Sequence, residues 1–100
     1  MKNRTLLLLI PLIASTAAVA AGDRYTATLA QPLEKKKEYI VEMNVWRCEA
    51  ATCVLVSRPV DADSVSSCRH LMRQVGALVG YGNAGKPFDD KKLAACNNPG

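Results

Sequence analysis

Four cysteines constrain the fold of this chain more than any other feature of its sequence: Cys48, Cys53, Cys68 and Cys96. In an oxidising compartment an even number of cysteines predicts disulfides, and four cysteines allow three pairings. The alternative is a zinc site, which favours two closely spaced cysteine pairs. Only Cys48 and Cys53 are close in sequence, so the spacing favours two disulfides, and we expect neither a metal ligand nor a cofactor.

The N-terminal residues predict the compartment in which these cysteines fold. Positive charge comes first, at Lys2 and Arg4, an apolar run over residues 6–13 follows, and small residues continue up to Ala21. Charge, apolar run and small-residue cleavage site, in that order, are typical of a secretory signal. We expect cleavage after Ala20 or Ala21 and a periplasmic or secreted location.

An uncleaved membrane anchor is the alternative interpretation of the same N-terminus. A membrane-spanning helix needs about 20 predominantly apolar residues, and the strongly apolar part here is shorter, so we expect no stable span after cleavage. The predicted organisation is a signal peptide over residues 1–20, a mobile N-terminal arm over 21–37, a folded domain over 38–97 and a tail over 98–100. The arm has room for one short extended piece near residues 25–29. Because the remaining domain is small, its modest core benefits from covalent cross-links.

The charge distribution argues against a nucleic-acid-binding role. The chain has 13 basic and 9 acidic residues, and removal of Lys2 and Arg4 with the signal leaves 11 against 9, a net charge of +2. A nucleic-acid interface needs basic residues clustered on one face. The lysine run over residues 35–37 lies between Glu34 and Glu38, which is typical of a solvated segment.

The first part of the domain predicts a β-hairpin. Residues 38–48 alternate between apolar and polar side chains with a period of two, which favours a strand. A second short strand over residues 53–58 ends before Pro59, which cannot donate a ladder hydrogen bond. The four-residue connection over residues 49–52 is a common hairpin loop.

The predicted hairpin register favours one disulfide pairing. It places Cys48 directly opposite Cys53, and opposed residues in antiparallel strands have β-carbon separations suited to a disulfide. Cys48–Cys53 is therefore the favoured first bridge, and Cys68–Cys96 follows by elimination.

The same register divides the apolar residues of the hairpin between two faces. One face carries aliphatic side chains: Val41, Met43, Val45, Val54 and Val56. The other carries Ile40, Trp46, Leu55 and the two cysteines. We expect the aliphatic face to pack against the following helix.

The second half of the chain predicts a helix over residues 61–75, a third strand over 77–81, a glycine-containing turn over 82–85 and a short helix over 91–96. Asp61, Asp63 or Ser64 can cap the first helix, and Asp89 or Asp90 can cap the last. The first helix has apolar residues at helical spacing, which predicts its buried stripe: Val65, Cys68, Leu71, Met72 and Val75. Arg69 and Arg73 are expected on its solvated side. Gly76 suits the C-terminal cap of this helix. The predicted fold class is a small α+β domain with two disulfides.

The cysteine framework resembles an uncharacterised family of small exported alphaproteobacterial proteins. The resemblance rests on a Trp-x-Cys-x4-Cys pattern followed by Arg-Pro, a cysteine early in a helix and a closing Cys-Asn. In this chain the pattern reads Trp46-Arg47-Cys48, Cys53, Arg58-Pro59, Cys68 and Cys96-Asn97. It implies an exported location and this cysteine framework, and it supplies no catalytic residue.

Cys68 and His70 are the residues considered for a catalytic role. Cys68 lies beside Arg69 and His70, which would favour a reactive thiolate if the cysteine were free and exposed, but its place on the apolar stripe favours a bonded, structural cysteine. His70 is the only histidine, and the sequence places no catalytic partner beside it.

Three aromatic residues, Trp46, Tyr81 and Phe88, are candidates for an interaction surface, since such residues are enriched at interfaces. In so small a domain they are also the expected material of the core.

These observations predict a non-enzymatic binding or structural module of the cell envelope, with an envelope protein or a cell-wall component as candidate partner. A thiol-redox or small hydrolytic enzyme using Cys68 or His70, and an N-terminally anchored envelope protein, are the alternatives.

Overall fold

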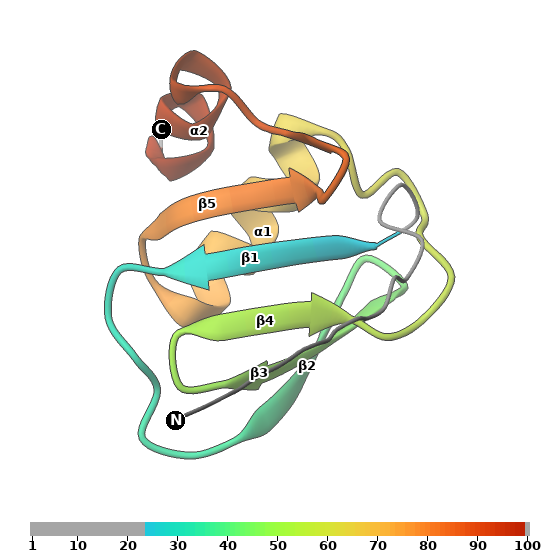
Figure 1. Ribbon diagram of the computed structural model, residues 1–100, viewed down its shortest axis with the longest axis vertical. Helices are drawn as coiled ribbons and strands as arrows, with labels where there is room; N and C mark the ends of the chain where they lie inside the picture. Colours follow the sequence, from blue (N-terminus) through green and yellow to red (C-terminus); the bar gives the residue numbers. More distant parts are fainter. Residues whose placement is uncertain (1–23, 100) are drawn as a thin grey trace, which may run out of the picture.

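The computed structural model describes residues 24–99, which form an antiparallel sheet and two helices (Figure 1). The elements are β1 (Tyr25–Leu29), β2 (Lys37–Val41), β3 (Asn44–Glu49), β4 (Thr52–Leu55), α1 (Val65–Val75), β5 (Leu78–Asn83), β6 (Lys86–Pro87) and α2 (Asp90–Asn97). The strand order is β2-β3-β4-β1-β5-β6. The predicted α+β class is therefore confirmed. The predicted signal peptide lies outside the described residues.

Strand β1 lies in the middle of the sheet, between β4 and β5 (Figure 1). The short extended piece expected near residues 25–29 is strand β1, and it is part of the sheet, so the folded domain includes residues before residue 38. Ala27 and Leu29 explain the placement, because both are almost fully buried while Thr28 between them is exposed. That alternation is the signature of a strand with one buried face.

The single strand predicted over residues 38–48 is two strands joined by a tight turn at Glu42 and Met43. Both residues have positive φ, 51° and 71°, as the central residues of a type I′ hairpin turn require. Such turns favour asparagine and glycine, so Glu-Met gives no turn signal. The apolar alternation continues through the turn and disguises it as one strand.

The predicted register between β3 and β4 is confirmed, because Cys48 pairs with Cys53 and Trp46 with Leu55. Both favoured disulfides are present, Cys48–Cys53 and Cys68–Cys96. The connection is shorter than predicted, since Glu49 and Thr52 are themselves paired. The two bridges indicate folding in an oxidising compartment.

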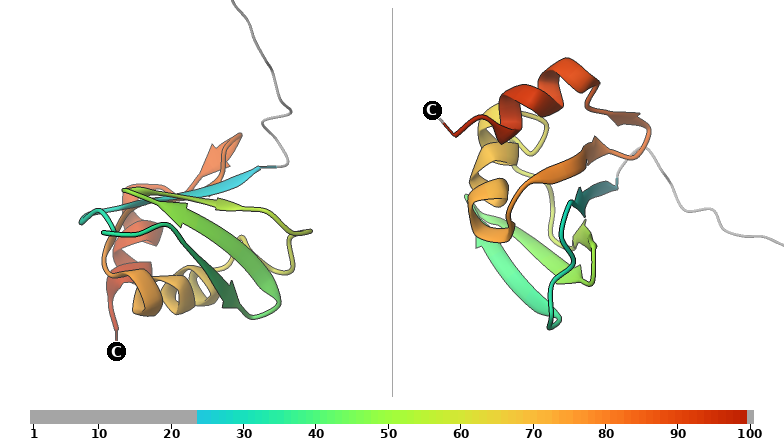
Figure 2. Two further views of the ribbon diagram at one scale, coloured as in Figure 1. Left: turned by 90° about the horizontal axis from the view of Figure 1, so that it is seen from below. Right: turned by 90° about the vertical axis from the view of Figure 1, so that its left-hand side faces the viewer.

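The buried face of the sheet is the opposite of the one predicted. Trp46 and the disulfide cysteines lie in the core, whereas Met43 and Val56 of the aliphatic face are 76% and 44% exposed. Figure 2 shows α1 on one side of the sheet, and this helix covers the Trp46 side. The indole buries more apolar surface than any valine, which explains why its face meets the helix. Ile40, predicted beside Trp46, is 74% exposed because the turn at residues 42–43 puts it on the other face.

Helix α1 begins at Val65, so the last of its three predicted caps, Ser64, is the one used. The Ser64 hydroxyl accepts a hydrogen bond from the Ser67 amide at 3.0 Å, which caps the helix at Val65. Gly76 ends the helix as predicted, with a φ of 93° that favours glycine. The predicted apolar stripe faces the core, with Leu71 fully buried.

Helix α2 packs against α1 and β5 through the Cys68–Cys96 disulfide and two polar contacts. The Asn97 side chain hydrogen-bonds both backbone groups of Leu78, at 2.8 Å and 2.7 Å. Arg69 does not simply face solvent, because its guanidinium donates to the Ala95 carbonyl at 2.7 Å. These contacts give a structural role to the closing Cys-Asn pair of the sequence. Within residues 24–99, neither helix has the length and apolar character of a membrane span.

Candidate functional site

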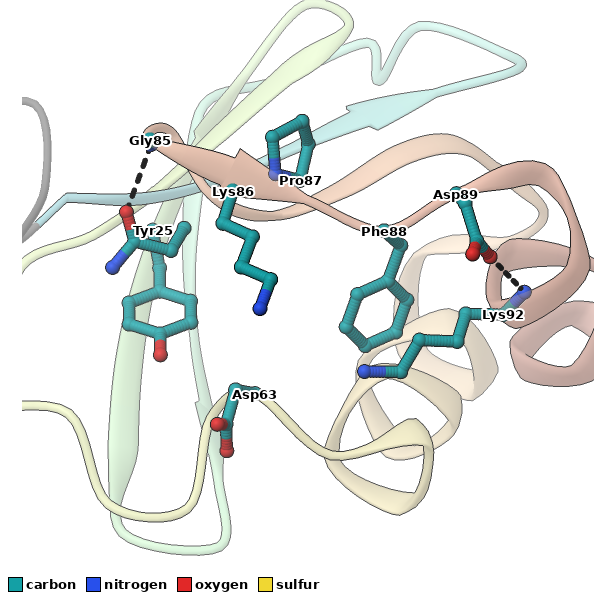
Figure 3. A pocket seen from close by; sticks show the side chains of 9 residues that line it. Tyr25, Asp63, Gly85, Lys86, Pro87, Phe88, Asp89 and Lys92 are labelled. Carbon is teal, nitrogen blue, oxygen red and sulfur yellow. Dashed lines mark hydrogen bonds between the residues drawn. The ribbon is translucent and has the colours of Figure 1, made fainter.

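A cavity of about 690 Å³ opens where the β5–β6 hairpin, the start of β1 and the first turn of α2 meet (Figure 3). Its lining residues are Tyr25, Asp63, Asn83, Gly85, Lys86, Pro87, Phe88, Asp89 and Lys92. We call this cavity the Phe88 groove. It combines two aromatic rings with charged side chains of both signs, the mixture of apolar surface and polar groups that is typical of ligand sites.

The β5–β6 hairpin forms one wall of the groove. The chain turns at residues 84–85, where the Gly85 amide donates to the Asn83 side chain at 2.9 Å. A β-carbon at Gly82 would lie 3.0 Å from backbone atoms of Pro87 and Phe88, and Gly82 has a φ of 135°. Glycine at this position therefore allows the segment bearing Phe88 to return closely along β5. The Phe88 amide then donates to the Tyr81 carbonyl at 2.9 Å.

The two lysines of the groove have no carboxylate partner among residues 24–99, because neither Lys86 nor Lys92 makes an ion pair there. The Lys92 ammonium lies 4.5 Å from the centre of the Phe88 ring, a cation–π contact that holds it at the groove wall. The Asp89 carboxylate caps α2 by accepting from the Lys92 amide at 2.8 Å. Asp63 lies on the far side, in the loop before α1 (Figure 3).

The three aromatic candidates form one continuous stack that leads from the core to the groove. The Trp46 and Tyr81 ring centres are 5.6 Å apart, and those of Tyr81 and Phe88 are 5.0 Å apart. Trp46 and Tyr81 are 0% and 2% exposed, so they belong to the core rather than to an interaction surface. Phe88 is only half-buried and alone reaches the groove.

Tyr81 has a pKa above the ordinary value of a tyrosine hydroxyl. Burial removes its hydroxyl from water and is the main reason that its pKa rises to about 12, while the nearby Ser67 hydroxyl opposes the rise. The hydroxyl donates to the Ala62 carbonyl at 2.6 Å, which attaches the loop before α1 to β5. The shifted pKa therefore reflects a structural contact in the core.

The residues considered for catalysis are not brought together. Cys68 is fully buried and bonded to Cys96, so it offers no thiol. His70 Nδ1 lies 2.9 Å from the Ser66 carbonyl oxygen and 3.3 Å from a Glu42 carboxylate oxygen. The Glu42 contact connects α1 to the β2–β3 turn. In the described part of the chain no three histidine, cysteine or acidic side chains gather as a metal site would require.

The outer face of the sheet carries a second, shallower concavity of about 550 Å³. Its lining residues are Arg24, Arg47, Glu49, Ala50, Thr52, Val54 and Val56. An exposed ion pair between Arg47 and Glu38, at 2.8 Å, lies on the same face. This concavity has no aromatic wall, so it is the weaker candidate for a ligand site.

Sequence reasoning identified Phe88 and missed Tyr25, Lys86 and Lys92. The segment Gly85-Lys86-Pro87-Phe88-Asp89 did contain a signal for such a site. In it a lysine and an aromatic residue lie between a turn glycine and a helix-capping aspartate. Tyr25 was missed because its segment was assigned to a mobile arm.

Comparison with known proteins gives one match. A model described as "Family of unknown function (DUF8200)" matches residues 8–98. No curated protein and no solved structure matches the chain.

Proposed function

The chain belongs to this family of unknown function, and from its geometry we propose that it is an exported, non-enzymatic module that binds a cell-wall saccharide in the Phe88 groove. The location we propose is the periplasm of an alphaproteobacterium, reached through a signal peptide over residues 1–20. The two disulfides and the charge, apolar run and small residues of the N-terminus support export.

The observation that carries the proposal is the pairing of Tyr25 and Phe88 on opposite walls of one cavity (Figure 3). An aromatic face carries partial negative charge and attracts the weakly positive C–H groups on the flat side of a sugar ring. The Asp63 carboxylate also lines this cavity and can accept hydrogen bonds from sugar hydroxyls. Apolar rings with a few polar acceptors are the combination that a saccharide requires.

The non-enzymatic part of the proposal follows from the chemistry of these lining groups. A pair of carboxylates that performs glycoside hydrolysis must both face the scissile bond. Here the Asp89 carboxylate caps α2, where it accepts from the Lys92 amide at 2.8 Å, while Asp63 lies in the loop before α1 on the far side of the groove. We therefore propose that the groove holds a saccharide without cleaving it, because one of its two carboxylates serves as a helix cap.

Co-sedimentation with purified cell-wall sacculi tests the proposal. We expect the oxidised mature protein to sediment with the sacculi and to release no soluble glycan from them. The variant Phe88→Leu keeps apolar packing against Tyr81 and removes the ring, so it should bind about three- to tenfold more weakly. Val79→Ala is the matched control, because Val79 is 59% exposed on β5 and lies outside the groove.

Two outcomes would contradict this proposal. Wild-type protein that stays in the supernatant would exclude the wall as partner, and equal binding by both variants would exclude the groove as the site. The export part is checked by the mass of the protein recovered from the periplasm, which should correspond to cleavage after Ala20 or Ala21.

A further inference from the structure

The Phe88 groove contains two lysines, which a site for a neutral saccharide does not need. Lys86 comes from β6 and Lys92 from the first turn of α2, and Figure 3 shows both side chains extending toward the space between the Tyr25 and Phe88 rings. Neither ammonium has a carboxylate within ion-pair distance among residues 24–99. Two ammonium groups that converge on one cavity, neither of them in an ion pair, are available to an anionic ligand.

Two carboxylates also line the groove, those of Asp63 and Asp89, and neither forms an ion pair with Lys86 or Lys92. The Asp89 carboxylate is engaged by the Lys92 backbone amide at 2.8 Å, and its position there also suits the positive end of the α2 dipole. Asp63 lies on the other side of the groove, where it is available to hydroxyl donors. Both ammonium groups thus remain available to a ligand, with Asp63 across the cavity from them.

Lys92 is held in place before a ligand arrives. Its ammonium lies 4.5 Å from the centre of the Phe88 ring, and this cation–π contact restricts an otherwise flexible side chain. Restricting a binding group in advance lowers the entropy lost on association. Phe88 therefore contributes twice, as an apolar wall and as the support for a cation.

From this arrangement we infer that the Phe88 groove selects saccharides that carry an anionic group. The sugar ring lies between Tyr25 and Phe88, the anionic group lies between Lys86 and Lys92, and ring hydroxyls donate to Asp63. This inference rests on the proposed function and adds the ligand class. A carboxylate and a phosphate fit the two ammonium groups equally, so the shared chemistry is an anion on a sugar ring.

Calorimetric titration of the oxidised mature protein tests the inference with three probes. They are trigalacturonic acid, its methyl ester and mannose 6-phosphate. We expect an anionic probe to bind about tenfold more tightly than the neutral methyl ester, because two charge-assisted contacts are lost in the ester. The preference should shrink as ionic strength rises. The anionic probe that binds more tightly identifies the source of the anion.

A pair of double variants assigns the preference to the groove. Lys86→Gln with Lys92→Gln should abolish the anionic preference while the thermal unfolding of the protein stays unchanged. Lys36→Gln with Lys91→Gln removes the same net charge at positions outside the groove and should leave the preference intact. If both double variants lose the preference for the anionic probe equally, the preference depends on net charge alone and the inference is wrong.

Failure of the inference is distinguishable from failure of the proposed function. If sacculi retain the protein through Phe88 but the methyl ester binds as tightly as the acid, the groove is a neutral saccharide site and the anionic selection is wrong. If neither sacculi nor any probe binds, both statements are wrong.

Discussion

Replacing Met43 with glycine tests the turn that divides the first predicted strand. Met43 has a φ of 71° and its side chain is 76% exposed. A non-glycine residue in the left-handed region costs about 1–2 kcal/mol, and glycine costs about 0.5–1 kcal/mol in lost chain freedom on folding. Few contacts are lost with so exposed a side chain. Met43→Gly should therefore stabilise the protein by about 0.5–1 kcal/mol.

Thermal unfolding of the oxidised mature protein measures this gain. In a domain of this size it corresponds to a melting temperature about 2–8 °C higher, and the buried Trp46 supplies the fluorescence signal. Met43→Ala is the control, because it removes the same side chain while keeping the β-carbon and hence the strain. If Met43→Gly instead destabilises by about 0.5–1 kcal/mol, as glycine does inside a strand, residues 42–43 continue one strand and the observed topology is wrong.

Three further predictions concern the core, one ionisable group and one disulfide. Leu71→Ala should destabilise by about 2–5 kcal/mol in urea titrations because Leu71 is fully buried. Ile40→Thr, at 74% exposure, should stay within about 0.5 kcal/mol; a loss for Ile40→Thr as large as that for Leu71→Ala would mean that the outer face of β2 is buried. Above pH 10 the unfolded-state Tyr81 ionises while the folded one, with a pKa of about 12, keeps its proton, so stability should fall with rising pH by up to about 1.4 kcal/mol per unit until about pH 12. Tyr81→Phe should remove that part of the alkaline loss, and an unchanged pH profile would contradict the assignment. The double change Cys68→Ala with Cys96→Ala opens a loop with a sequence separation of 28 and should cost about 3.5 kcal/mol; an unchanged unfolding midpoint would contradict the role given to this bridge.

The disulfides and helix caps could be predicted from sequence because local rules determine them. Once a short loop places Cys48 opposite Cys53, the bridge follows from strand geometry, and only one pairing is left for the other two cysteines. Gly76 marks the end of α1 by its tolerance of positive φ. In each case the residue itself carries the physical reason for the structure around it.

The buried face of the sheet could not be predicted, because both faces of the hairpin carry apolar residues. Trp46 and Leu55 on one side compete with Val45, Val54 and Val56 on the other, and the choice depends on where α1 packs. The turn at residues 42–43, which no typical turn residue indicates, also places the residues before it on the opposite side of the sheet from the one predicted. A shift of one residue moves every side chain of a strand to the other face. Long-range packing decides both points.

The groove was also beyond local reasoning, since its walls come from parts of the chain that are far apart in sequence. Tyr25, Asp63 and Lys92 each look like an ordinary strand, loop or helix residue in isolation. Only the pairing of β1 with β5, and the return of the β5–β6 hairpin toward α2, bring them to one cavity. Phe88 was recognised because aromatic residues are rare in this chain.

The most direct test of the central claim is a map of the amide chemical shifts that change when trigalacturonic acid is added to isotopically labelled mature protein. The account predicts that the shifted amides cluster at Tyr25, Asp63 and residues 85–92, around the Phe88 groove. Shifts confined to the outer face of β2, β3 and β4, or a spectrum unchanged at saturating probe, would contradict it.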